Sequence, residues 1–372
     1  MKIAVDLTSL ADNFSGIERF ALSISKELIR IDKVNKYILI FKNNVNDEFE
    51  SFLNEDNVEV RVLKGRGKLY FNQVTLMKNL YKIKADKYLF LAFQSPILFR
   101  KSGIINTVHD LTSWDYPNTM KRLSKMYFKI SILDAIKKSQ NIITISKFSQ
   151  RRIKEKFNLD TWLIYCGISD TFLKADYQED ENDQKILSKY GIKNKYLMCL
   201  CTLEPRKNIE ILVESFIELK IDEKIDFNCK LVLVGRRGWK IDKLIDEINS
   251  EYNKDIIITG FVDEKDIPVI YRNSLCFVFP SLYEGFGIPV LEAMNMGALV
   301  IASNTSSIPE VLGENYSYMF ENNNKKDLKR KIVEVLNLEK DDLIRIKSNQ
   351  RERSKKFNWR CEAKKLLCLL EE

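Results

Sequence analysis

Short apolar runs alternate with amphipathic stretches along this chain of 372 residues. Short apolar runs bounded by turn residues are typical of buried strands, whereas apolar positions three or four residues apart indicate helices. The helical pattern is clear just after Ser15 and Gly16, where Ile17, Phe20 and Ile24 mark one face. The first half of the chain has predicted strands near residues 2–7, 37–41, 58–63, 87–93, 103–111, 141–146 and 162–167.

A second alternating series begins after a polar, acidic stretch, KADYQEDENDQ at 174–184, which has no apolar period and is the predicted hinge. Alternating strands and helices predict an α/β fold with two Rossmann-like domains, each built on a parallel sheet. We expect an N-terminal domain at 1–174, a C-terminal domain at 175–355 and an amphipathic helix at 356–372 that is able to pack across the domain boundary. The strands of the second series are YLMCLCTL, CKLVLVG, DIIITGFV, SLCFVFPS and ALVIAS.

The length and composition agree with this division. A chain of 372 residues exceeds one ordinary hydrophobic core, and 45% hydrophobic with 30% charged residues is typical of a globular protein. No apolar run is long enough to span a membrane, and Asp6 falls where a signal peptide would be apolar. We therefore expect a cytoplasmic protein.

The positive charge is concentrated between Lys121 and Lys156. This segment has eleven basic and two acidic residues, a balance of +9 against +8 for the whole chain. Apolar residues are interleaved with the charges, so one interpretation is a surface that binds anionic lipid on the inner face of the plasma membrane. The other is a solvated helix face whose apolar side packs inward. Nucleic-acid binding is disfavoured because no recognised motif accompanies the charge.

Several unusual loops follow predicted strands, where open parallel sheets bind ligands. Arg206 and Lys207 lie between a strand and a helix whose predicted N-cap is Asn208. Two cations beside a helix N-terminus favour a diphosphate site, although an ordinary basic loop would have the same sequence.

A glycine-flanked turn with two carboxylates lies in FPSLYEGFGIPVLEAMNMG at 279–297. Its glycines let the backbone approach a ligand closely. If Pro289 is the first helical residue, Glu292 lies in the first turn of the next helix, opposite Glu284. Such carboxylates could accept hydroxyl protons of a phosphorylated sugar. The alternative is that Glu292 caps its own helix and Glu284 is a solvated loop residue.

His109 is the only histidine. It follows a predicted strand and precedes Asp110, which favours a place in a cleft, but a lone histidine is also commonly structural. A single histidine excludes a multi-histidine metal site. The chain has no GxxxxGK[ST], GxGxxG, HExxH or hydrophobic-flanked DxD motif, so ATP-binding, dinucleotide-binding and metalloprotease functions lose their main support.

The motifs of the second half, in order and spacing, resemble those of family 4 retaining glycosyltransferases of the GT-B fold. In the first half, SGIERF, VHDLTSWDYP, IITISKFSQRRI and YCGISDTF are similar to the acceptor domain of the same family. The nearest resemblance is to bacterial mannosyltransferases of O-antigen and capsule assembly. The motifs of the second half are TLEPRKNIEILVESF, LVLVGRRGW, GFVDEKDIPVIYRNS, FPSLYEGFGIPVLEAMNMG and IASNTSSIPEVLGE.

The resemblance implies a role for each matching residue. Arg206 and Lys207 would bind the diphosphate of a nucleotide-sugar donor, and Glu284 the hydroxyls of the transferred sugar. His109 would contact that sugar near its anomeric carbon. Donor-binding positions implied in the same way are Gly16, Asp110, Gly260, Phe261, Val262, Gly285, Phe286, Gly287, Leu291 and Glu292. Cys201 departs from the family, in which glycine is frequent at this position, and leaves slightly less room there.

The resemblance further implies retaining transfer of a hexose without a metal or cofactor, in GT-B domains that face a cleft. GDP-mannose is the first candidate donor, and a lipid-diphosphate-linked glycan the expected acceptor. Two alternatives stay open: a nucleotide-sugar epimerase on the same fold, and a catalytically silent subunit that binds sugar nucleotide beside a partner transferase.

Overall fold

The computed structural model describes residues 1–11, 15–178 and 180–372, and its contacts divide the chain into two units. The first unit comprises Met1–Gly167 with Asn358–Glu372, and the second Ile168–Phe357. The polar stretch that was the predicted hinge lies in the second unit. There Arg272 Nε donates to Asp183 Oδ2 at 2.8 Å, and its Nη1 donates to the Asp176 carbonyl at 2.8 Å.

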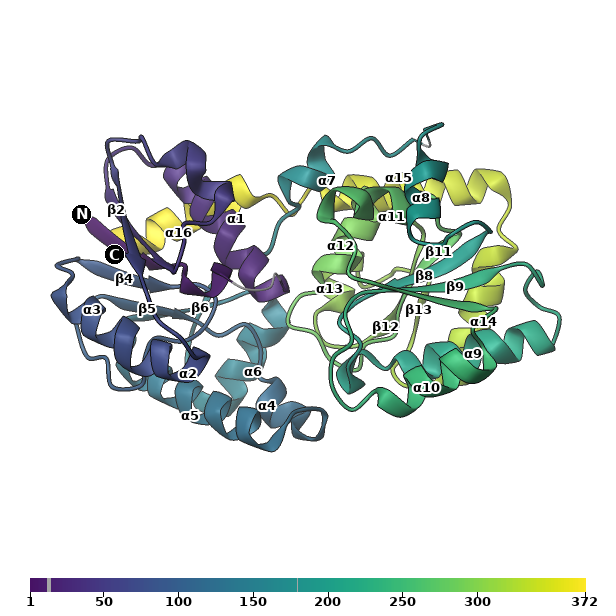
Figure 1. The fold of residues 1–372 in the computed structure, drawn as a ribbon, viewed down its shortest axis with the longest axis horizontal. Helices are drawn as coiled ribbons and strands as arrows, with labels where there is room; N and C mark the ends of the chain where they lie inside the picture. Colours follow the sequence, from purple (N-terminus) through teal and green to yellow (C-terminus); the bar gives the residue numbers. More distant parts are fainter. Residues whose placement is uncertain (12–14, 179) are drawn as a thin grey trace. The chain divides into compact units, whose positions relative to one another are not determined.

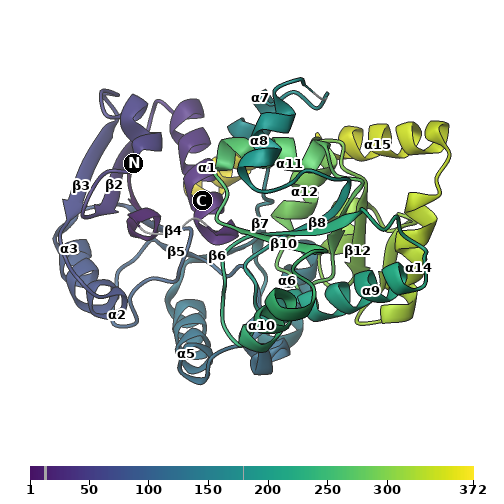
Figure 2. The ribbon, with the colours of Figure 1, turned by 45° about the vertical axis from the view of Figure 1, so that its right-hand side comes forward.

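The first unit is built on a seven-stranded sheet in the order β3-β2-β1-β4-β5-β6-β7, with every pairing parallel. Helices α1 and α16 lie on one face of this sheet and α2, α3 and α5 on the other (Figures 1 and 2). The strands are β1 (Lys2–Asp6), β2 (Lys36–Lys42), β3 (Val58–Leu63), β4 (Lys87–Phe90), β5 (Ile104–Thr107), β6 (Asn141–Thr144) and β7 (Trp162–Leu163). The helices are α1 (Gly16–Ile31), α2 (Lys68–Tyr70), α3 (Met77–Lys82), α4 (Thr112–Asp115), α5 (Arg122–Lys138), α6 (Lys147–Phe157) and α16 (Trp359–Glu371).

The sequence starts α1 with a capping box. Ser15 is the N-cap, its hydroxyl accepts from the Ile17 amide, and the Glu18 carboxylate accepts from the Ser15 amide at 3.1 Å. The buried face of the helix contacts α16, the last helix of the chain. The Phe20 ring meets Trp359 edge-on, with centroids 5.7 Å apart. The C-terminal segment thus returns to complete the first unit.

The second unit has a six-stranded parallel sheet in the order β10-β9-β8-β11-β12-β13. Helices α9, α10 and α14 cover one face, and α11, α12 and α15 the other (Figure 1). The strands are β8 (Tyr196–Leu200), β9 (Lys230–Val234), β10 (Ile256–Gly260), β11 (Cys276–Phe279), β12 (Val300–Asn304) and β13 (Met319–Glu321). The helices are α7 (Asp170–Lys174), α8 (Asp183–Lys189), α9 (Ile209–Ile221), α10 (Asp242–Glu251), α11 (Ile267–Arg272), α12 (Ile288–Asn295), α13 (Ile308–Leu312), α14 (Lys325–Leu336) and α15 (Lys340–Ser354).

Each strand that the apolar pattern predicts is confirmed, and one further strand was missed. β13 is only three residues long, and its burial pattern leaves Glu321 exposed, so it has no apolar run to reveal it. The outermost position of β13 in the sheet explains why so short a pairing is sufficient.

Strand order reverses once in each sheet, and these reversals locate the ligand sites expected of open parallel sheets. In the first unit the reversal lies between β1 and β4, and in the second between β8 and β11. The loops after these strands are therefore the places to look for chemistry. Within the part of the chain that the structure describes, no helix is both long and apolar enough to cross a membrane.

We expect Leu366→Ala to lower the free energy of unfolding by about 2–5 kcal/mol, because it opens a cavity under a helix that closes the first unit. Leu366 is fully buried in α16. The measurement is urea denaturation, with Lys364→Ala as the matched control on the exposed face of the same helix. Equal losses for the two variants would contradict the packing role of α16.

Candidate functional site

Two loops flank the strand reversal of the second unit. The first follows β8 and contains the short helix Pro205–Lys207 before α9. The second is the turn 281–287 between β11 and α12. The Leu282 amide donates to the Arg206 carbonyl at 2.9 Å and ties the loops together. Because β8 and β11 are neighbours in the sheet, residues far apart in sequence meet here.

Arg206, Lys207 and Glu284 form a partly buried ion cluster in which the buried carboxylate of Glu284 accepts from both cations. Lys207 Nζ lies 2.6 Å from Glu284 Oε1, and Arg206 Nη1 lies 3.1 Å from Oε2. Arg206 also donates to the Tyr283 carbonyl at 2.8 Å and to Glu204 Oε1 at 2.9 Å. The cluster therefore confirms that Glu284 is not a solvated loop residue.

The electrostatics of the cluster are nearly balanced. Burial by itself would raise the pKa of Glu284, but the charges of Lys207 and Arg206 outweigh it and lower that pKa to about 2. With Glu204 included, two carboxylates face two cations, so the formal charge sums to zero. The Lys207 ammonium also lies 5.2 Å from the ring centroid of Phe279. A charged ligand would therefore meet two cations that are already paired with carboxylates, and not a site with a net positive charge.

Asn208 follows the pair as the N-cap of α9, as the sequence predicts, but its side chain makes no capping bond. Its backbone is left-handed, with φ of 52°, and its side-chain Nδ2 donates to Asn323 Oδ1 at 3.2 Å. The loop is thus held from the side by the segment before α14.

The prediction that Glu292 lies in the first turn of α12 was wrong. Ile288 is the first helical residue and Pro289 the second, which places Glu292 in the second turn. Glu292 is buried, and the Tyr271 hydroxyl lies 3.4 Å from its Oε2. Its side chain therefore does not act as the N-terminal cap considered as an alternative, because a cap precedes the first turn.

The rest of the turn brings its backbone close to neighbouring segments. Gly287 has φ of 103°, and a Cβ there would lie 2.8 Å from Ile308 Cδ1. Gly285 and Phe286 precede it and are buried, as is Leu291 on α12. A glycine at 287 is needed both for its dihedral angle and for the close approach.

The turn after β10 presents an exposed aromatic ring. Gly260 has φ of 67°, Phe261 is exposed and Val262 is buried. The guanidinium carbon of Arg236 lies 4.6 Å from the Phe261 ring centroid. This stacked pair lies at the carboxyl ends of β9 and β10, and β9 is the neighbour of β8 in the sheet.

His109, Asp110 and Gly16 belong to the first unit. His109 follows β5 and is buried, with Nε2 2.9 Å from the Leu91 carbonyl, so this nitrogen carries the proton. Burial lowers the pKa of His109, although that hydrogen bond and the charge of Asp110 act in the opposite sense. The imidazole is therefore neutral at neutral pH.

The other two residues, Asp110 and Gly16, also lie in the first unit. Asp110 Oδ1 accepts from the Thr112 amide at 2.8 Å, and exposed Gly16 begins α1.

Sequence reasoning missed Glu204, which fixes the guanidinium of Arg206 from the opposite side. The sequence could have pointed to Glu204, because this carboxylate lies two residues before Arg206 in the quoted motif TLEPRK. Among the described residues, no group of three or more His, Cys, Asp and Glu is arranged to hold a metal ion.

Comparison with known proteins agrees with this architecture. Residues 179–353 match the family described as Glycosyl transferases group 1. This segment includes the ion cluster and most of the second unit. Over these residues the chain is a group 1 glycosyltransferase, which is the class of enzyme that the motifs suggested.

Named relatives and solved structures extend the similarity to the whole chain. O-antigen chain mannosyltransferase B of Escherichia coli is 26% identical over 329 residues, which is 84% of this chain and 85% of that protein. The serotype-specific mannosyltransferase WbdA of Escherichia coli is 28% identical over 62% of this chain, but the match covers 29% of WbdA. The structure of HepE from Anabaena in complex with UDP-glucose has a TM-score of 0.75 at 17% identity and covers 100% of this chain and 99% of HepE. The predicted GT-B fold class is thereby confirmed.

The ion cluster predicts a defined pH dependence for this glycosyltransferase. The pKa of Glu284 is about 2 in the folded chain, below its ordinary value of 4.5, so its stabilising effect is complete above pH 4.5 and declines as the pH falls toward 2. We expect Glu284→Gln to destabilise the apo protein at neutral pH and the difference from wild type to shrink across that window. Urea denaturation at a series of pH values measures it. A difference independent of pH would contradict the ion pairing.

Proposed function

We propose that this glycosyltransferase transfers a hexose from a nucleotide diphosphate sugar to a lipid-diphosphate-linked glycan, with retention of configuration at the anomeric carbon. The observation that supports it most directly is the cluster of Arg206, Lys207 and Glu284 at the strand reversal of the second unit. The cluster combines donors for phosphate with an acceptor for sugar hydroxyls. Open α/β sheets bind ligands at this place.

In this proposal Arg206 and Lys207 stabilise the diphosphate as it leaves. Breaking the bond between the anomeric carbon and the phosphate oxygen puts negative charge on the diphosphate, and fixed cations lower the barrier because they need no reorganisation. Glu204 and Glu284 hold the two side chains in place before the donor arrives. The donor phosphates then compete with Glu284 for the ammonium and guanidinium groups.

Glu284 positions the sugar in this proposal and does not act as a proton donor. A carboxyl group with a pKa of about 2 is ionised at neutral pH, so it accepts hydrogen bonds from hydroxyl groups and has no proton to give. The acceptor hydroxyl attacks from the face that the diphosphate leaves, and a phosphate oxygen takes its proton. No covalent intermediate on the protein is required.

The other implied contacts belong to the same proposal. Glu292 and Leu291 line the nucleotide pocket, while Gly285, Phe286 and Gly287 present backbone to the sugar and phosphates. Gly260, Phe261 and Val262 frame the base. For Gly16, His109 and Asp110, which belong to the first unit, donor contact is what the family resemblance implies.

Mannose from GDP-mannose is the first candidate for the transferred group. Support comes from the names of the relatives, among which O-antigen chain mannosyltransferases recur at 26% and 25% identity. The UDP-glucose complex of HepE makes UDP-glucose the natural second donor to try. The acceptor in this proposal is a growing cell-surface polysaccharide.

We expect Lys207→Ala to lower kcat by about 10²–10³-fold, the usual effect of removing one preorganised charge-stabilising donor. The assay follows release of nucleoside diphosphate from a panel that includes GDP-mannose and UDP-glucose, with a lipid-diphosphate acceptor. Lys325→Ala is the matched control, because it removes an exposed lysine paired with Glu214 and Glu218 in the same unit. Unchanged turnover in Lys207→Ala would contradict the site assignment.

Glu284→Gln separates binding from transfer in the same assay. It removes a carboxylate that competes for the cations, so we expect affinity for a nucleoside diphosphate at least equal to wild type, while transfer falls. Tight binding of a nucleotide sugar by the wild-type protein without transfer to any acceptor would favour the silent-subunit alternative.

We further propose that α5 contacts an anionic membrane surface. Leu123, Met126, Ile130 and Leu133 recur every three or four residues and form an exposed stripe, and Leu123 and Met126 are 78% and 56% exposed. In the alternative interpretation the helix face is solvated and its apolar side packs inward. The four apolar side chains of this stripe are instead exposed. Basic residues of the same helix flank it: Arg122, Lys125, Lys129 and Lys137.

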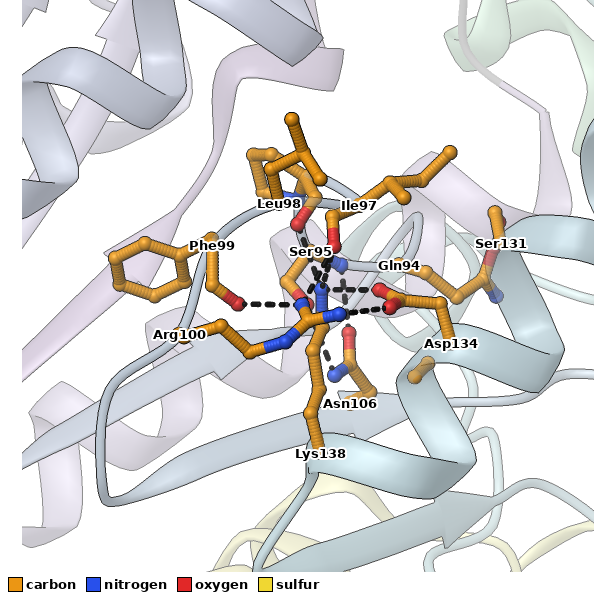
Figure 3. A network of polar contacts seen from close by, with 12 residues as sticks. Gln94, Ser95, Ile97, Leu98, Phe99, Arg100, Asn106, Ser131, Asp134 and Lys138 are labelled. Atoms are coloured by element: carbon orange, nitrogen blue, oxygen red, sulfur yellow. Dashed lines mark hydrogen bonds and ion pairs between the residues drawn. The ribbon is translucent and has the colours of Figure 1, made fainter.

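A buried polar network fixes α5 to the loop after β4 (Figure 3). Ser131 donates to Gln94 Oε1 at 2.9 Å, and Lys138 donates to the Pro96 carbonyl at 2.6 Å while it pairs with Asp134. Burial lowers the pKa of Lys138, and Asp134 acts in the opposite sense. The network joins α5 to this loop, on which Leu98 is exposed.

Two basic residues of α6 are paired with carboxylates. Arg152 pairs with Asp115 at 2.8 Å and with Glu155 at 2.5 Å, and Lys154 pairs with Asp160 at 2.8 Å. The exposed apolar stripe lies on α5, so the proposed membrane contact within 121–156 is centred on that helix.

We expect Met126→Asp to weaken binding to phosphatidylglycerol vesicles about tenfold, because the contact loses a buried side chain worth about 1.5 kcal/mol or more. Vesicle co-sedimentation at two salt concentrations measures it, and binding should fall with added salt. Arg152→Gln is the control and should bind like wild type. If Arg152→Gln weakens binding and Met126→Asp does not, the surface lies on α6 instead.

A further inference from the structure

The turn that carries Glu284 has no regular secondary structure, so its buried backbone groups need partners from elsewhere. One side is held by the loop after β8, through the bond from the Leu282 amide to the Arg206 carbonyl and the bond from Arg206 Nη1 to the Tyr283 carbonyl. The remaining polar groups face the segment 303–307, which begins with the last two residues of β12 and leads into α13.

Four hydroxyl residues of that segment, SNTSS in the sequence, each bond the backbone of the turn. The Ser303 hydroxyl donates to the Ser281 carbonyl, and Thr305 Oγ1 donates to the Leu282 carbonyl at 3.2 Å. We name the four residues Ser303, Thr305, Ser306 and Ser307 the hydroxyl clasp.

The last two members of the hydroxyl clasp bond the residues nearest the proposed donor. The Glu284 amide donates to Ser306 Oγ at 2.8 Å. Ser307 Oγ lies 3.1 Å from the Glu284 carbonyl and 2.9 Å from the Phe286 carbonyl, so its single hydrogen serves both. Ser307 is fully buried, and no water is needed to satisfy these carbonyls.

Backbone strain accompanies the hydroxyl clasp. Ser306 has φ of 50°, a left-handed conformation that a residue with a side chain adopts only when its surroundings hold it there. Asn208 and Asn323, with φ of 52° and 60°, are left-handed too and are bonded to each other beside the same loops. Strained residues of this kind gather at sites whose geometry must be fixed in advance.

We propose that Ser306 and Ser307 are positioning residues that set the backbone of the turn, and through it the carboxylate of Glu284, for the donor sugar. The proposal rests on the proposed function of Glu284. Serine hydroxyls at these positions define where the peptide groups from Glu284 to Phe286 point, and a shift of that backbone would misplace the carboxylate while Arg206 and Lys207 remain. The residues touch the turn and not the donor.

The test compares Ser307→Ala and Ser306→Gly with wild type. Glycine at 306 removes the hydroxyl while it keeps the left-handed backbone without strain. Ser215→Ala is the matched control: Ser215 is a fully buried serine of the same unit whose hydroxyl donates to the Ile211 carbonyl inside α9. Thr305→Val tests a weaker member, because the Leu282 carbonyl keeps Asn322 as a second donor at 3.3 Å.

We expect Ser307→Ala and Ser306→Gly to lower kcat/KM for the donor about tenfold to a hundredfold, the range expected when a positioning contact is loosened. The KM for the acceptor should stay near wild type, Thr305→Val should have a smaller effect, and Ser215→Ala none. Equal loss in Ser215→Ala, unchanged donor kinetics, or equal changes in both KM values would overturn the proposal, because a merely structural role predicts these results.

Hydrogen exchange of the peptide 281–287 in the apo protein tests the hydroxyl clasp independently of activity. Faster exchange in Ser306→Gly and Ser307→Ala, with no change in Ser215→Ala, supports it, and unchanged exchange contradicts it. If wild type transfers no sugar from any donor, the proposed function fails, while the exchange result still decides whether the hydroxyl clasp fixes the turn.

Discussion

The ion cluster of Arg206, Lys207 and Glu284 is the constraint on which the organisation of the second unit depends. Burying a carboxylate is costly unless cations and hydrogen bonds compensate, and the pKa of about 2 means that they do so for Glu284. The compensation requires the loop after β8 and the turn after β11 to be adjacent. That adjacency follows from strand order, because these two strands pair at the reversal of the sheet.

The same constraint explains why irregular backbone is tolerated in a buried place. Regular ladders end with β8 and β11, and beyond them the chain satisfies its peptide groups with side chains. Arg206 supplies one side, and Ser306 and Ser307 the other. Glycine at 287 allows the backbone to pass close to Ile308. The site is thus part of the core packing as well as a candidate for chemistry.

In the first unit, side-chain hydrogen bonds attach helix α5, which has an exposed apolar stripe, to the loop after β4. The network of Gln94, Ser131, Asp134 and Lys138 secures α5 against the loop after β4. With its buried groups satisfied in this way, α5 can leave an apolar stripe exposed without losing its attachment.

Alternation of apolar runs was enough to predict the two parallel sheets, because a strand covered on both faces must be apolar throughout. It was not enough for β13, whose position at the sheet edge removes that requirement. Local sequence likewise pointed to Arg206, Lys207 and Glu284 as charged residues after strands, and placed Asn208 correctly before α9.

Tertiary structure decided which of these residues meet. Glu284 pairs with cations 77 and 78 positions away, whereas Glu292, only eight positions along, bonds Tyr271 from α11 instead. Glu292 was misplaced because the predicted start of α12 was one residue too late: the helix begins at Ile288 and not at Pro289. Periodicity in a sequence records which face of an element is buried, but it does not record strand order or the exact start of a helix. Those depend on contacts between distant segments, and so the partners of each charge were fixed only by the fold.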